Sequence, residues 1–186
     1  MPWEHTANMA ATHPLLERFD SVEYGICRKF NRVADRKWPC RLFQAASWLG
    51  NGIVWYMLAG ALLVAHGAAA APLVAAMTIT GLSGVAIYKY LKVRLIRERP
   101  CIRHAGIRRA MAPLDRYSFP SGHTMHAVSF TWQVVTHFPE LGWILIPLAA
   151  QIALSRVVLG LHYPSDVLAG AVLGSGLAAA GVALAA

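Results

Sequence analysis

The chain has 186 residues, of which 56% are hydrophobic and only 14% are charged, with a mean hydropathy of +0.45. An ordinary soluble domain has about a quarter of its residues charged, so this composition excludes that class and indicates a polytopic membrane protein. The net charge of +8 is concentrated before the first long apolar segment and in one central stretch. Because both basic stretches flank membrane-length segments, they favour anionic lipid head groups or a phosphate substrate as partners, and not nucleic acid.

The cysteines and the first residues exclude two further features. Cys27, Cys40 and Cys101 are odd in number and lack CxxC spacing, so we expect neither a disulfide framework nor a zinc site. The N-terminus has no apolar core, which predicts that no signal peptide is present.

Residues 1–40 predict an amphipathic N-terminal segment that does not cross the membrane. Apolar residues recur with helical spacing from Leu15 to Val33, and charged residues occupy the rest of the helical wheel. Two placements fit this pattern. The helix could lie in the membrane interface, or it could pack on the end of the bundle with a solvated outer face.

Residues 41–186 predict a transmembrane domain of five apolar segments joined by short turns. Together with the N-terminal helix, they predict an all-α, polytopic membrane bundle of about five transmembrane helices. Gly170 and Gly174 are four residues apart in the last segment, which predicts close helix packing there. The five expected segments are residues 42–66, 72–95, 122–138, 143–161 and 165–186.

Polar residues cluster at four ends of these segments, and alternating directions bring the four ends to one face of the membrane. The pattern therefore predicts one site. Its expected members are Lys92 and Arg99 after the second segment, Ser121, Gly122 and His123 at the third, Arg156 and His162 at the fourth, and Asp166 at the fifth.

These residue types suit a tetrahedral oxyanion. Three cations can hold its oxygens, and the Ser121-Gly122 backbone at a helix start adds N–H donors. Of two histidines, one oriented by a carboxylate can attack phosphorus, while the other protonates the leaving oxygen. The spacing alone does not decide which histidine attacks, although Asp166 follows His162 by four residues. This chemistry requires no metal or other cofactor, and the sequence has no carboxylate cluster to hold one.

Three motifs carry a family resemblance. They are Lys92-(six residues)-Arg99-Pro100, Pro120-Ser121-Gly122-His123 and Ser155-Arg156-(five residues)-His162-(three residues)-Asp166. In order and spacing they resemble the signature motifs of the type 2 phosphatidic acid phosphatase (PAP2) superfamily. Within that superfamily the chain resembles the membrane lipid phosphatases, such as undecaprenyl diphosphatases and phosphatidylglycerophosphatases of the B type.

The resemblance implies a metal-independent lipid phosphatase. It implies that His162 is the nucleophile forming a phosphohistidine, that Asp166 orients it and that His123 is the general acid. It also implies that Lys92, Arg99, Ser121, Gly122 and Arg156 bind the phosphate. The implied substrate is a lipid phosphomonoester or diphosphate. The small size of the chain and the dense cations near the site favour a polyprenyl (undecaprenyl) diphosphate over a phospholipid phosphate.

The resemblance also leaves alternatives open. Family members commonly have six spans, and here the first is replaced by the basic segment at 15–40. The family implies a bacterial inner-membrane protein with an exterior site, whereas the positive-inside rule points to a cytoplasmic one. The central loop could recognise a head group or be merely solvated; its candidate residues are Arg103, Arg108, Arg109 and Arg116.

Two other functions compete with the phosphatase reading. One is a vanadate-dependent haloperoxidase-like activity, which the spanning segments oppose. The other is a non-catalytic lipid-binding scaffold, which the intact histidines oppose. The expected partners are the bilayer and a lipid substrate, and a homo-oligomer is compatible with the sequence.

Overall fold

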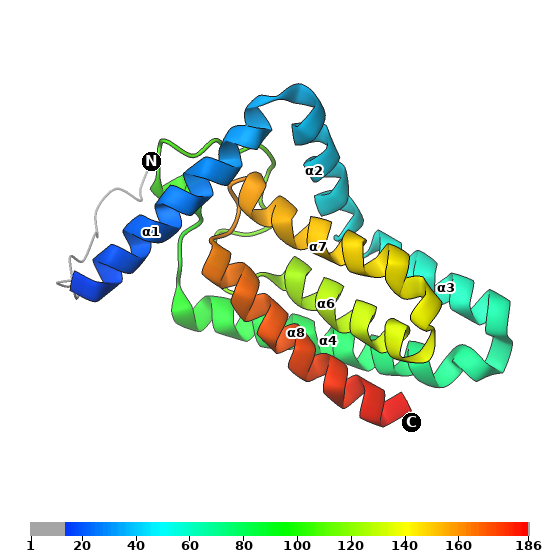
Figure 1. The fold of residues 1–186 in the computed structure, drawn as a ribbon. Coiled ribbons are helices and arrows are strands. Elements are labelled where there is room, and N and C mark those ends of the chain that lie inside the picture. Colours follow the sequence, from blue (N-terminus) through cyan, green and yellow to red (C-terminus); the bar gives the residue numbers. More distant parts are fainter. Residues whose placement is uncertain (1–13, 186) are drawn as a thin grey trace.

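The computed structural model describes residues 14–185, and within that range the chain is a bundle of helices with no β-strand. Figure 1 shows α3, α4, α6, α7 and α8 running along one another, while α1 lies obliquely across one end. The α-helices are α1 (Pro14–Asn31), α2 (Lys37–Leu49), α3 (Ile53–His66), α4 (Ala71–Leu95), α5 (Pro100–Arg103), α6 (Gly122–His137), α7 (Gly142–Val158) and α8 (Pro164–Ala185). Three short 3₁₀ helices join them: η1 (Arg32–Asp35), η2 (Gly67–Ala70) and η3 (Pro139–Leu141).

Three helical stretches of the described chain are long and apolar enough to cross a membrane. They are Ile53–Leu95, Pro139–Val158 and Pro164–Leu184. The first contains a hairpin, because η2 turns the chain back between α3 and α4 (Figure 1). Helix α6 has 16 residues, fewer than the roughly 20 that a full crossing needs. The all-helical membrane bundle is confirmed, and the count of five crossings stays a prediction.

The predicted first segment, residues 42–66, is not one helix. Helix α2 ends at Leu49 and α3 begins at Ile53, with Gly-Asn-Gly at positions 50–52 between them. Gly52 has φ +116°, a backbone conformation that side chains with a Cβ rarely adopt. The prediction of a continuous segment was wrong because average hydropathy does not register a glycine-rich break inside an apolar run.

Helix α1 confirms the predicted N-terminal helix but buries an unexpected face. Glu23 and Asn31 are buried against the bundle, together with Cys27 between them. The apolar side chains of the same stretch point outward instead; these are Val22, Ile26 and Phe30. The helix therefore packs on the bundle end through a partly polar face and leaves an apolar stripe uncovered.

Helices α6 and α8 make a close backbone contact that brings two predicted motifs together. A Cβ at Gly170 would lie 2.5 Å from the Ser121 carbonyl oxygen, and one at Gly174 would lie 2.4 Å from that of Met125. The predicted close packing at these glycines is confirmed. The contact allows the Ser121 N–H to donate to the Asp166 carbonyl at 3.0 Å, so the starts of α6 and α8 are joined.

We predict that Gly174→Ala lowers the thermal unfolding midpoint in detergent, because the added methyl group would overlap the α6 backbone. Overpacking of this kind costs about 1–3 kcal/mol. Gly176→Ala is the matched control, since nothing lies within 4 Å of its Cβ position on the same helix. It should be neutral or stabilise by up to about 1 kcal/mol. Equal midpoints for the two variants would contradict the close packing.

Candidate active site

The predicted site residues meet in one cavity of about 800 Å³. Ser121 and Asp166 are buried beside it, so the four helix ends converge as the topology predicted. The other six predicted residues line it: Lys92, Arg99, Gly122, His123, Arg156 and His162.

His162 lies in the turn between α7 and α8, with its two ring nitrogens in different surroundings. Nε2 is 3.1 Å from the Arg99 Nη1, and Nδ1 is 3.6 Å from the Asp166 Oδ2. Because a guanidinium only donates, Nε2 acts as acceptor and the ring proton belongs on Nδ1, facing the carboxylate. Burial, followed by the charges of Arg156 and Arg99, lowers the pKa of His162 well below its ordinary value. The ring is therefore neutral, with a lone pair on Nε2.

Asp166 is held in the first turn of α8. Its Oδ2 accepts from the Tyr163 N–H at 2.8 Å, the backward bond of a capping box. Its Oδ1 accepts from the Arg97 Nη1 at 2.7 Å. Sequence reasoning missed Arg97, because nothing distinguishes it from its neighbours in the basic stretch at 89–116.

Arg156, near the end of α7, is a buried cation without a carboxylate partner among the described residues. Only 3% of it is exposed. It donates to the Ser47 hydroxyl of α2, and its Nε has no hydrogen-bond partner within residues 14–185. A buried charge without a counter-charge is strongly unfavourable, so the site is suited to an incoming anion.

Asp115, which sequence reasoning also missed, pairs with the other two cations. Its oxygens accept from the Lys92 Nζ at 2.8 and 2.7 Å and from the Arg99 Nη2 at 2.8 Å. Burial raises the pKa of Asp115, but these two partners outweigh it and hold the pKa below its usual value. One signal was available: Asp115 is the only acidic residue between Arg99 and Ser121.

His123 lies in the first turn of α6. Ser121 caps this helix by accepting from the Thr124 N–H at 3.5 Å. The His123 Nε2 is 2.5 Å from the Asn51 amide oxygen, in the break between α2 and α3. Asn51 was missed because the break itself was missed. The start of α6 thus directs a helix dipole and a histidine into the cavity.

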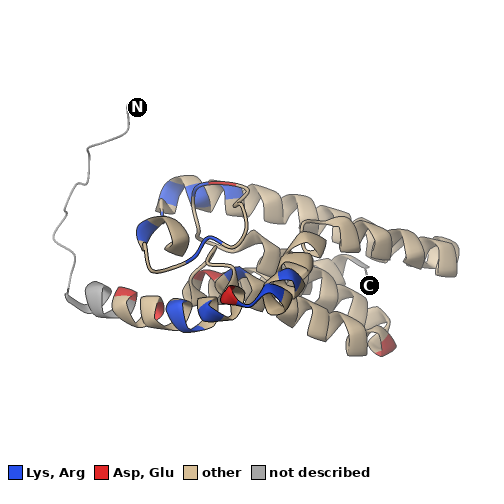
Figure 2. Ribbon diagram, turned by 90° about the horizontal axis from the view of Figure 1, so that it is seen from above, with Lys and Arg blue, Asp and Glu red and all other residues tan. Residues whose placement is uncertain are grey.

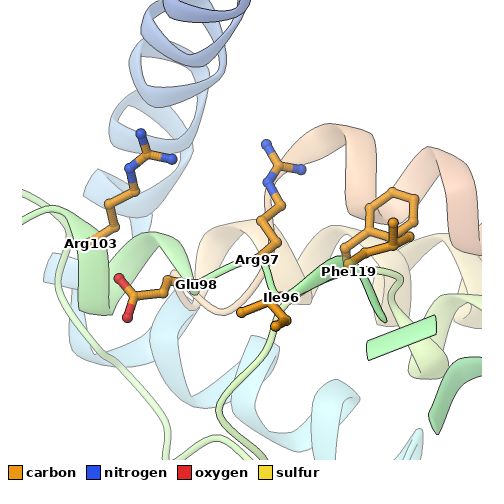
Figure 3. Close-up of a pocket in the computed structure, with 6 residues that line it drawn as sticks. Ile96, Arg97, Glu98, Arg103 and Phe119 are labelled. Atoms are coloured by element: carbon orange, nitrogen blue, oxygen red, sulfur yellow. The ribbon is translucent and has the colours of Figure 1, made fainter. Parts of the chain in front are cut away.

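The four loop arginines lie outside this cavity. Arg103 pairs with Asp20 at 3.0 Å and lines a separate surface pocket of about 470 Å³ (Figure 3). Arg116 pairs with Glu98 at 3.1 Å. Arg108 donates to the Ala34 carbonyl, and Arg109 is exposed. Their role in head-group recognition stays a prediction.

Away from the charged groups the cavity wall is apolar. Its side chains come from α3, α4 and α6, and include Trp55, Tyr56, Val74, Met77, Leu82, Val85 and Phe130. Figure 2 shows the same division over the whole molecule: lysine and arginine gather at the end that holds the site, and the opposite end is almost free of charge. The cavity can therefore take a ligand with an anionic end and an apolar chain.

Comparisons with known proteins agree with this geometry. The model of the PAP2 superfamily matches residues 69–185. The chain is 30% identical over 90 residues to the undecaprenyl-diphosphatase BcrC of Bacillus subtilis (strain 168), covering 48% of this chain and 46% of that protein. It is 35% identical over 89 residues to a lipid A 1-phosphatase of Rhizobium johnstonii, covering 46% and 36%. The chain therefore spans less than half the length of these relatives.

A solved structure extends the likeness to most of the fold. It is the PAP2-type phosphatidylglycerolphosphate phosphatase of Bacillus subtilis, with a TM-score of 0.69 and 24% identity. The superposition covers 88% of this chain and 84% of that one, so it includes helices N-terminal to residue 69.

We predict that Asp115→Asn tightens the binding of inorganic phosphate, measured by calorimetry in detergent. Removing the carboxylate frees two cations and relieves about 1 kcal/mol of repulsion, which lowers Kd roughly threefold to tenfold. Glu98→Gln is the control, because its ion pair with Arg116 is exposed and lies outside the cavity. Weaker binding by Asp115→Asn would mean that Asp115 positions the cations instead of competing for them.

Proposed function

The chain belongs to the PAP2 superfamily, and from that premise we propose that it is a membrane lipid phosphatase. The observation that carries the proposal is the composition of one cavity. Its lining includes His123, His162 and the cations Lys92, Arg99 and Arg156, and much of the rest of its wall is apolar. A lipid phosphate has this same division between an anionic head and an apolar chain.

In the proposed reaction, the His162 Nε2 attacks phosphorus and the bond from phosphorus to the leaving oxygen breaks. His123, as the imidazolium, gives a ring proton to that oxygen and becomes neutral, and a phosphohistidine forms on His162. Water then attacks the phosphohistidine and gives a proton to His123, which releases phosphate and restores both histidines. Asp166 keeps the proton of His162 on Nδ1 and stabilises the positive ring that forms during attack.

The phosphate oxygens are proposed to lie against three cations and the start of α6. Arg156 offers donors that no described carboxylate occupies, and Lys92 and Arg99 exchange Asp115 for the phosphate. Ser121 and Gly122 contribute the N–H groups at the helix N-terminus. In this scheme the protein's own cations stabilise the transition state.

The proposed substrate is a polyprenyl diphosphate such as undecaprenyl diphosphate. Its long chain suits the apolar wall between α3, α4 and α6, and its two phosphates suit the density of cations. The relative from Bacillus subtilis that is named an undecaprenyl-diphosphatase supports this choice. A phospholipid phosphate is the alternative, supported by the relatives named for lipid A and phosphatidylglycerolphosphate.

The apolar helices and the membrane phosphatase relatives make the chain an integral membrane protein. We propose that α3, α4, α6, α7 and α8 cross the bacterial cytoplasmic membrane, with residues 41–186 forming the transmembrane phosphatase domain. We further propose that α1, in the segment 1–40, lies in the interface. Its uncovered apolar stripe supports this placement, since Val22, Ile26 and Phe30 would enter the lipid.

We expect the purified protein to release phosphate from undecaprenyl diphosphate in the presence of a chelator. His162→Ala should reduce release by at least about a thousandfold, on the scale of nucleophile loss in other hydrolases. His137→Ala is the matched control, a histidine near the end of α6 that contacts the Gln133 carbonyl. A panel with phosphatidic acid and phosphatidylglycerophosphate identifies the preferred lipid. Undiminished release by His162→Ala would exclude it as nucleophile, and loss in chelator would exclude the metal-independent reaction.

An exposed histidine is half protonated at about pH 6.5. We also predict that His162 is still neutral at that pH and just below it. Its lowered pKa in the folded state favours the neutral ring, so stability linked to His162 is present above pH 6.5 and is lost as pH falls through the folded pKa. Nuclear magnetic resonance of ¹⁵N-histidine-labelled protein measures the ring state, with His162→Ala assigning the signal. Protonation at pH 6.5 or above would contradict the effect of burial.

A further inference from the structure

Glu23 is a buried carboxylate on α1, N-terminal to the region that the family model matches. Only 3% of it is exposed, whereas its neighbour Val22 is 61% exposed. A helix gains nothing from burying a carboxylate unless that group finds charged or hydrogen-bonding partners. The partners of Glu23 therefore indicate what this face of α1 does.

Both carboxylate oxygens of Glu23 accept hydrogen bonds. One bond comes from the first turn of α8, and the other comes from Arg97, which itself contacts that turn. Oε1 accepts from the Ser165 N–H at 2.8 Å. The first N–H groups of a helix have no acceptor within the helix, so α1 supplies α8 with an acceptor and a favourable negative charge. Oε2 accepts from the Arg97 Nη2 at 2.5 Å.

Arg97 connects this carboxylate to Asp166. Its Nη1 donates to the Asp166 Oδ1 at 2.7 Å and to the Ser165 hydroxyl at 2.6 Å. The guanidinium also lies over the Tyr163 ring, 4.0 Å from its centroid. In Figure 3, Arg97 and Arg103 extend in the same direction, and Glu98 points elsewhere. Contacts at both Nη atoms and at the guanidinium face fix the orientation of the fork.

The geometry points to Glu23 and Arg97 as positioning residues for the pair His162 and Asp166, and this inference rests on the proposed function. A guanidinium bonded to two carboxylates leaves the group of Glu23, Arg97 and Asp166 with one net negative charge. That charge matches the positive ring that His162 becomes during attack. Arg97 holds the Asp166 carboxylate toward His162, and Glu23 holds Arg97.

This role differs in a measurable way from a purely structural tie between α1 and the bundle. Neither Glu23 nor Arg97 is in the cavity lining that holds the phosphate-binding cations. Losing a positioning contact therefore lowers kcat and leaves KM and phosphate affinity unchanged. Losing a purely structural contact instead lowers the thermal unfolding midpoint. Such a variant should regain native activity when it is assayed well below that midpoint.

The experiment compares Glu23→Gln, Arg97→Gln and Arg97→Lys with the native protein. Each is assayed for phosphate release from lipid, for binding of inorganic phosphate and for thermal unfolding. Glu23→Gln, which keeps the shape and removes the charge, should lower kcat roughly tenfold with KM unchanged. Arg97→Gln should lower it by about 10- to 100-fold, the scale of losing an orienting partner. Arg97→Lys should recover part of the lost kcat, because lysine restores the positive charge but not the planar guanidinium.

Asp20→Asn is the matched control on the same helix. Asp20 pairs with Arg103 at 3.0 Å and approaches Arg97 only to 3.9 Å, so kcat should stay within about twofold. Native kcat in folded Glu23→Gln and Arg97→Gln would overturn the inference, and so would a loss that disappears at low temperature. A native protein that releases no phosphate from any lipid would instead contradict the proposed function.

Discussion

Asp166 is a carboxylate with no exposed surface, and the organisation of the site depends on how it is accommodated. Desolvating such a charge costs several kcal/mol, which its partners must offset. The Tyr163 N–H and Arg97 supply charge and hydrogen bonds, and Ser121 joins the start of α6 to the same residue through the backbone. Three separated segments therefore have to meet before this carboxylate is stable, and their meeting places His162 beside the cations.

The convergence of the helix ends was predictable because it follows from chain direction alone. Short turns force neighbouring apolar segments to alternate, so residues at successive ends on one side gather together. Lys92, His123, Arg156 and His162 could be placed in one site by this rule before any coordinate was known. The close approach of α6 and α8 was predictable for a similar local reason, because Gly174 leaves room for a backbone where any side chain would not.

The remaining members of the site depend on contacts that no periodicity encodes. Asp115 lies in an irregular loop, and its contact with two cations depends on how that loop folds over the cavity. Asn51 reaches His123 because three residues interrupt a run that average hydropathy treats as continuous. Glu23 was not singled out, since a hydrophobic pattern predicts that the apolar side of a helix is buried. In a membrane that expectation is reversed when lipid covers the apolar side.

The packing of helix α1 constrains the number of residues between its two buried polar side chains. Its buried residues Glu23, Cys27 and Asn31 are four apart, and Asn31 fastens the helix end by donating to the Val158 and Arg108 carbonyls. An α-helix turns by about 100° per residue, so one inserted or deleted residue between these two polar anchors would rotate Glu23 away from α8. Length between Glu23 and Asn31 is therefore constrained more tightly than the identity of the outward residues. Exchange of one apolar side chain for another on the lipid side leaves the anchors in place, whereas a single-residue indel does not.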